Sequence, residues 1–71
     1  PANYWWGGDC LNDFKNMVKD AIADELGAVA MYTQMANMVE DPTLKALILS
    51  IAGDEYGHAR TWMVIQNLYH M

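Results

Sequence analysis

The sequence predicts an all-α fold, in which two antiparallel helices form a hairpin and two hairpins pair into a four-helix bundle. Apolar residues recur at steps of three and four along most of the chain, which is the helical period. Asp41-Pro42 lies between two such stretches. It marks the start of a second helix, because Asp is a favoured N-cap and Pro is favoured at the first helical position. Of the 71 residues, 54% are hydrophobic, which is more apolar surface than two helices can bury against each other. We therefore expect part of this surface to face a second copy of the chain.

The helical hairpin is expected to occupy residues 9–71. The first helix should run over about residues 10–39, with Asp9 or Asn12 as its N-cap. Its apolar positions are Phe14, Val18, Ala21, Ala28, Tyr32, Met35 and Val39. The one long gap in this series lies between Ala21 and Ala28, and Glu25 stands in its middle.

The second helix should run over about residues 42–69. Its stripe of periodic positions reads Leu44, Ile48, Ile51, Glu55, His58, Trp62, Ile65 and Tyr69. Glu55 and His58 therefore stand where the pattern requires apolar side chains. The short connection between the two stretches predicts antiparallel neighbours.

Residues 1–8, PANYWWGG, read as an irregular aromatic lead-in that precedes the hairpin. Tyr4, Trp5 and Trp6 could pack on a neighbouring chain, since aromatic residues are enriched at interfaces. They could equally cover the end of their own bundle, and the sequence leaves both interpretations open.

Composition excludes several classes of partner. With a formal net charge of −5 and only four Lys and Arg, the chain is not expected to bind nucleic acid. No uncharged apolar run reaches the roughly 18–20 residues of a membrane span, so no membrane partner is expected. Cys10 is the single cysteine, which excludes an internal disulfide and suits a reducing, cytoplasmic compartment. A chain this small then needs a metal or a partner subunit for its stability.

Glu25, Glu55 and His58 are the candidate metal ligands. At a rise of about 1.5 Å per residue, Glu25 lies roughly 25 Å before Pro42, while Glu55 and His58 lie roughly 20 and 24 Å beyond it. Antiparallel packing thus brings the three side chains to nearly the same level. Carboxylate and imidazole ligands suit iron, manganese or zinc. A local contact between Glu55 and His58, which are neighbours on one helix face, is the alternative to a metal site.

One hairpin supplies three ligands, which are too few for two ions. A two-fold partner doubles the set to four Glu and two His, as in di-iron bundles that combine two single Glu residues with two Glu-x-x-His motifs. The ligand count therefore predicts two metal ions shared by a homodimer near its two-fold axis, and the likeness to di-iron bundles favours iron over manganese or zinc.

The same residues resemble the ferritin-like superfamily, in particular rubrerythrin-type domains and encapsulated ferritins. The matching segments are ELGA at 25–28 followed by Tyr32, DPTL at 41–44, and EYGHA at 55–59. The resemblance covers about residues 14–69. It implies a ferroxidase centre between two chains in larger ring assemblies, with Glu25 bridging the metals while Glu55 and His58 each bind one ion, and with Glu55 able to bridge as well.

Two departures limit the resemblance. The chain has neither the second pair of metal-binding helices nor the Cys-rich segment of classical rubrerythrins. It also shows no shell-targeting tail after Met71, so delivery into a protein shell is unsupported.

We expect the site to oxidise Fe(II) with oxygen or peroxide. Rubrerythrin-like peroxide scavenging, metal sequestration without turnover and a purely structural helical oligomer are the alternatives. Tyr32 could donate a hydrogen bond to a metal-bound carboxylate, although core packing is an equal explanation. Trp62, one turn beyond His58, is expected to cover the site and exclude water.

Overall fold

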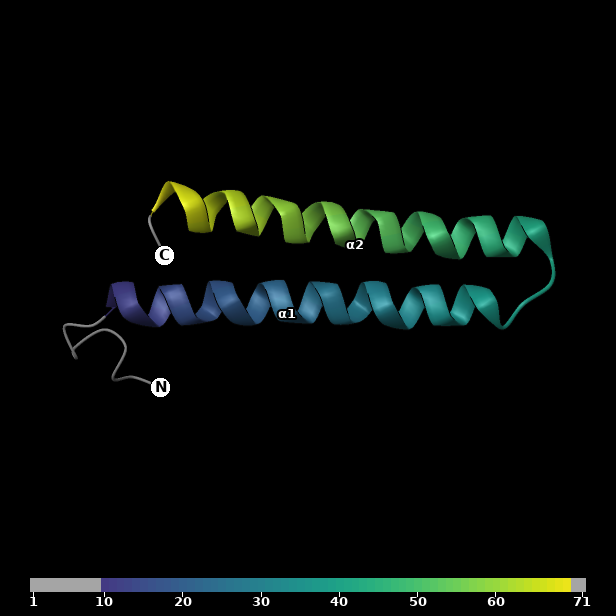
Figure 1. Cartoon of the computed structure of the whole chain (residues 1–71), viewed down its shortest axis with the longest axis horizontal. Coiled ribbons are helices and arrows are strands. Elements are labelled where there is room, and N and C mark those ends of the chain that lie inside the picture. The colour runs from purple at the N-terminus through teal and green to yellow at the C-terminus, as the bar shows by residue number, and fades with distance from the viewer. Residues whose placement is uncertain (1–9, 70–71) are drawn as a thin grey trace.

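The chain forms an antiparallel hairpin of two long helices, α1 (Cys10–Asn37) and α2 (Pro42–Leu68) (Figure 1). This computed structural model describes residues 10–69; the predicted lead-in with Tyr4, Trp5 and Trp6, and the candidate cap Asp9, lie outside them. The hairpin is long and thin, with extents of 52 × 26 × 12 Å. Over its described length, neither helix is long and apolar enough to cross a membrane.

The turn between the helices is fixed by Asp41, as the sequence predicts. The Asp41 carboxylate accepts hydrogen bonds from the backbone N–H groups of Thr43, at 2.8 Å, and Leu44, at 3.2 Å. These groups would otherwise lack partners at the start of α2, and Pro42 needs none. The first helix ends at Asn37 rather than near Val39, because several residues are needed to reverse the chain before Asp41.

The two helices meet along a seam of small and half-buried side chains. The most buried residues are Val18, Ala36, Ala52 and Ala59, each with no more than 4% of its surface exposed. Alanines at the contact let the helices approach closely. The seam residues, buried or half-buried, are Val18, Ile22, Glu25, Val29, Tyr32 and Ala36 on α1, and Lys45, Ile48, Ala52, Glu55, Ala59 and Trp62 on α2.

The stripe predicted for the second helix is partly wrong in phase. Ala52 and Ala59 occupy the centre of the seam, whereas their neighbours Ile51 and His58 are exposed. On α1, Phe14 and Met35 are likewise exposed. The physical reason is size: the small alanines fit between the closely packed backbones, and the larger side chains remain at the edge.

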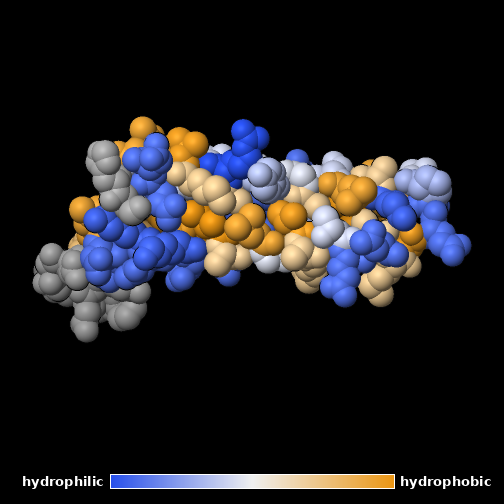
Figure 2. Space-filling model, viewed as in Figure 1, coloured by the Kyte–Doolittle hydropathy of each residue, from blue (hydrophilic) through white to orange (hydrophobic). Residues whose placement is uncertain are grey.

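Much apolar surface remains outside this seam. Figure 2 shows one broad face of the hairpin, with hydrophobic residues along its middle and hydrophilic residues gathered mainly toward both ends. Exposed large apolar side chains occur along the full length of both helices, from Leu11 to Leu68. Two helices alone therefore leave the hydrophobic residues only partly covered, as the composition predicts.

Candidate metal centre

Glu25, Glu55 and His58 converge at one level of the seam. The Nδ1 atom of His58 lies 3.5 Å from the Oε2 atom of Glu25 and 3.9 Å from the Oε1 atom of Glu55. One ligand atom from each of the three residues lies within 4.8 Å of the others. Among the described residues, this is the one group of three or more His, Cys, Asp or Glu with such geometry. The levels predicted from the helical rise are therefore confirmed.

The two carboxylates and the imidazole differ in their access to water. The side chains of Glu25 and Glu55 are 22% and 26% exposed, while that of His58 is 61% exposed. The carboxylates thus point into the hairpin, and the imidazole lies at its edge. His58 also lies nearer to Glu25 on the other helix than to Glu55 on its own, so the contact is more than a local pairing within α2.

Glu25 carries an unsatisfied polar atom. Its Oε2 atom is buried and makes no hydrogen bond to any described residue. A buried carboxylate oxygen without a partner costs free energy, so such atoms are rare in stable proteins. The contact with His58 at 3.5 Å does not meet the geometry of a hydrogen bond. The position therefore favours a hydrogen-bond donor or a cation beside Glu25.

The pKa of Glu55 is raised above its ordinary value of 4.5. The largest cause is the nearby Glu25 carboxyl group, to which Glu55 can donate a hydrogen bond when it is protonated, and burial and the negative charge of Glu25 add to it. His58 lowers the pKa, and Asp54 raises it further. Two carboxylates this close repel each other unless a positive charge or a shared proton lies between them.

A shallow apolar pocket of about 330 Å³ adjoins the three residues. It is lined by Glu25, His58, Thr61, Trp62 and Ile65. Trp62 thus lies beside the site, where the sequence places it. Tyr32 lies in the seam, half-buried, and its hydroxyl makes no hydrogen bond within the described part of the chain. Its predicted role toward a carboxylate therefore stays a prediction.

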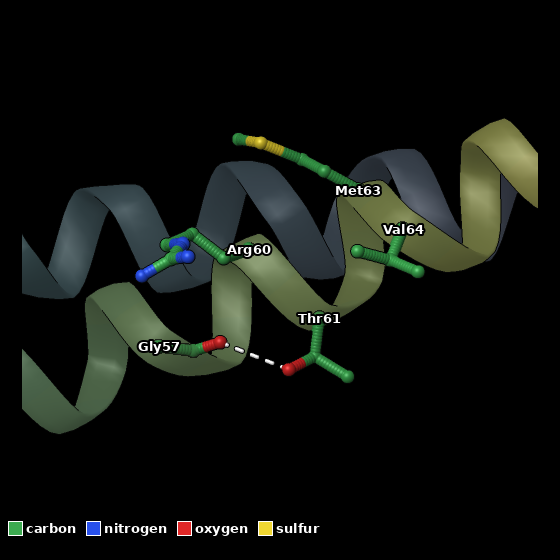
Figure 3. Close-up of a pocket in the computed structure, with 5 residues that line it drawn as sticks. All are labelled: Gly57, Arg60, Thr61, Met63 and Val64. Atoms are coloured by element: carbon green, nitrogen blue, oxygen red, sulfur yellow. Dashed lines mark hydrogen bonds between the residues drawn. The ribbon is translucent and has the colours of Figure 1, made fainter.

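A second and larger hollow, of about 480 Å³, lies on α2 alone. Its lining is Gly57, Arg60, Thr61, Met63 and Val64 (Figure 3). The Thr61 hydroxyl donates to the backbone carbonyl of Gly57 at 3.0 Å, so it is already engaged. Arg60 is the one charged side chain of this lining. The hollow lacks the convergent polar groups of a catalytic site.

Glu25, Glu55 and His58 have the donor types that hold divalent transition metals. In zinc sites the bonds from the metal to nitrogen or oxygen are about 2.0–2.2 Å long. Two atoms bound to the same ion therefore lie at most about 4.4 Å apart. The three ligand atoms, within 4.8 Å of one another, need only a small inward shift to meet this limit.

Comparison of the chain with protein-family models, curated proteins and solved structures finds no match. The ferritin-like resemblance therefore rests on the motif residues alone and stays a prediction.

Sequence reasoning missed Thr61 and Ile65, which line the pocket beside His58. Ile65 was part of the expected stripe, but nothing in its residue type indicated contact with a site. Thr61 carries no periodic signal. The one signal in the sequence that Thr61 lies near the site was its position directly before Trp62 and one helical turn after Gly57.

Proposed function

We propose that the chain is a di-iron protein of ferritin-like type that oxidises Fe(II) at a site shared by two copies. The observation that carries the proposal is the buried Oε2 atom of Glu25, which has no hydrogen-bond partner among the described residues and lies beside Glu55 and His58. An imidazole and two carboxylates around such an atom form a suitable donor set for a divalent cation.

The number of ligands supports two copies rather than one. A single hairpin offers one His and two Glu, which are enough to hold one ion in part but too few for a pair of ions. A second hairpin would double the ligands to four Glu and two His, which is the set that holds a pair of ions in di-iron bundles. The 61% exposure of His58 supports this arrangement, because the imidazole faces outward from the hairpin that carries it.

A bound iron pair supplies two electrons, one from each ion, to oxygen or to peroxide, which takes up two protons as it is reduced. The chain's own residues bind and position. Glu25 and Glu55 would balance the positive charge, and a metal ion would compete with protons for Glu55, whose pKa is raised in the metal-free chain. His58 would help to hold an ion, because its Nδ1 atom faces the carboxylate of Glu25 at 3.5 Å. Trp62 and Ile65 give the site an apolar border that limits access of water.

The proposal includes a reducing, cytoplasmic location, since Fe(II) and a cysteine thiol both persist there. The substrate is then ferrous iron, and oxygen or peroxide is the oxidant. Manganese or zinc would bind to the same three side chains, and zinc would not be oxidised there.

The test is an anaerobic Fe(II) titration of the metal-free protein, followed by exposure to oxygen or peroxide. We expect about one iron bound per chain, which is two per pair of hairpins, and ferric absorbance after the oxidant is added. Glu55→Gln and His58→Ala should abolish binding. Glu40→Gln, which changes an exposed carboxylate next to the turn, should bind like the unaltered chain.

Each other outcome has a meaning. Iron binding near zero would overturn the metal centre and leave a structural helical oligomer. Binding without oxidation would identify a sequestering protein. Oxidation far faster with peroxide than with oxygen would identify peroxide scavenging.

A further inference from the structure

Each helix of the hairpin carries a second stripe beside its seam. This outer stripe consists of residues that immediately precede seam residues, so it has the same alternating steps of three and four. On α1 it comprises Met17, Ala21, Asp24, Ala28, Met31 and Met35. On α2 it comprises Leu44, Leu47, Ile51, Asp54, His58 and Thr61.

The two outer stripes lie on the same face of the hairpin. Two antiparallel helices are related by an approximate two-fold axis perpendicular to the plane that contains them. Rotation about this axis exchanges the two helices, but a residue above the plane is carried to a position that is also above the plane. Positions that precede the seam on α1 and positions that precede the seam on α2 therefore share one face, and positions that follow the seam share the opposite face.

The two faces differ in chemistry. The outer stripe contains Met17, Met31, Met35, Leu44, Leu47 and Ile51, all of them exposed, and no Lys or Arg. The opposite face also has exposed apolar residues, such as Leu49 and Met63, but it carries Lys19 and Arg60 among them. A long, largely apolar stripe without Lys or Arg is unusual on a free surface and marks an interaction site.

The outer stripe is continuous with the candidate metal centre. His58 is itself a member of the stripe, and Asp24 and Asp54 directly precede Glu25 and Glu55. The exposed imidazole thus opens the centre toward this face and away from the face with Lys19 and Arg60.

We propose that the outer stripe is the surface on which a second copy of this chain docks to complete the metal centre. The proposal rests on the proposed function, because the incomplete donor set identifies the occupant as another set of the same ligands. In a two-fold contact the stripe meets itself, apolar residues cover apolar residues, and His58 becomes buried. Methionines suit such a contact, since their flexible side chains fill irregular gaps.

The test compares Leu47→Glu with Leu49→Glu in the iron-loaded protein. Both residues are exposed leucines on α2, at 60% and 45%, but Leu47 lies on the outer stripe and Leu49 on the opposite face. We expect Leu47→Glu to halve the mass of the pair in sedimentation equilibrium and Leu49→Glu to leave the pair intact. The reverse result, or an unchanged mass for both, would overturn the proposal.

A second pair of variants guards against unfolding. Met31→Glu on the outer stripe should separate the copies, and Leu26→Glu on the opposite face of the same helix should not, with helix content by circular dichroism unchanged in both. Iron binding is measured separately on the unaltered chain. If that chain binds no iron but Leu47→Glu still separates the copies, the docking surface holds and the metal function fails. If iron binds at about one per chain and Leu49→Glu alone separates the copies, the docking surface fails and the metal function holds.

Discussion

The seam and the outer stripe of this hairpin follow the same spacing along the same two helices, yet they contain different side chains. The seam centres on Val18, Ala36, Ala52 and Ala59, which are small and almost fully buried. The outer stripe carries larger apolar residues such as Leu47, which stay exposed. Burial of a large side chain stabilises a fold more than burial of alanine. The comparison indicates that the two helices are held together through small side chains, while many of the larger apolar side chains of the hairpin remain exposed.

The strongest test of this comparison is removal of the metal. In a two-fold contact, Glu25, Glu55, Asp24 and Asp54 of both copies come together, and the outer stripe has no Lys or Arg to balance them. Bound cations would supply that balance, so metal binding and pairing are linked. We expect a chelator to shift the population from pairs toward single hairpins, as measured by sedimentation.

An Asp24→Asn, Asp54→Asn double variant sharpens this test. It removes two charges per chain but leaves Glu25, Glu55 and His58 in place. Its pairing should persist better after chelation than that of the unaltered chain. Equal masses with and without metal in the unaltered chain would contradict the linkage.

The next largest effect should come from filling the seam. Ala59 has 0% of its surface exposed, so Ala59→Leu forces extra atoms between the closely packed helices. Overpacking of this kind costs about 1–3 kcal/mol. We expect the free energy of unfolding, measured with a chemical denaturant, to fall by that amount.

Ala46→Leu is the matched control, because Ala46 is an exposed alanine on the same helix. It should change the free energy of unfolding by no more than about 0.5 kcal/mol, as is usual for surface substitutions. A similar decrease in the free energy of unfolding for both variants would mean that Ala59 is not tightly packed between the two helices.

The sequence predicted the all-α hairpin, the start of α2 and the common level of Glu25, Glu55 and His58. These depend on local rules: the helical period, the capping preference of Asp41 before Pro42, and a constant rise per residue. The phase of the seam was missed, because hydrophobicity ranks Ile51 above Ala52, whereas close helix packing favours the smaller side chain. The pocket lining by Thr61 and Ile65 depends on the same phase, so it was missed as well. The pairing of hairpins and the bound metal stay predictions.

The smallest expected effect concerns Glu55 in the metal-free chain. Hydrogen bonding to Glu25, then burial and the charges of Glu25 and Asp54, raise the pKa of Glu55 above 4.5, while His58 opposes them. Between 4.5 and the raised pKa, the folded chain binds more protons than the unfolded chain. Stability therefore decreases as the pH rises through this window and is greatest below it. The effect should be modest, because Glu55 is partly exposed and solvent screens it.

Thermal unfolding of the metal-free chain at a series of pH values from 4.5 upward measures this slope. Glu55→Gln replaces the carboxyl with an amide that does not titrate, so its Tm should vary less with pH across the window. Glu40→Gln, on an exposed residue beside the turn, should keep the slope of the unaltered chain. If Glu55→Gln instead keeps the full slope, the proton does not reside on the Glu25–Glu55 pair, and these carboxylates are less tightly associated in the folded chain than their positions across the seam indicate.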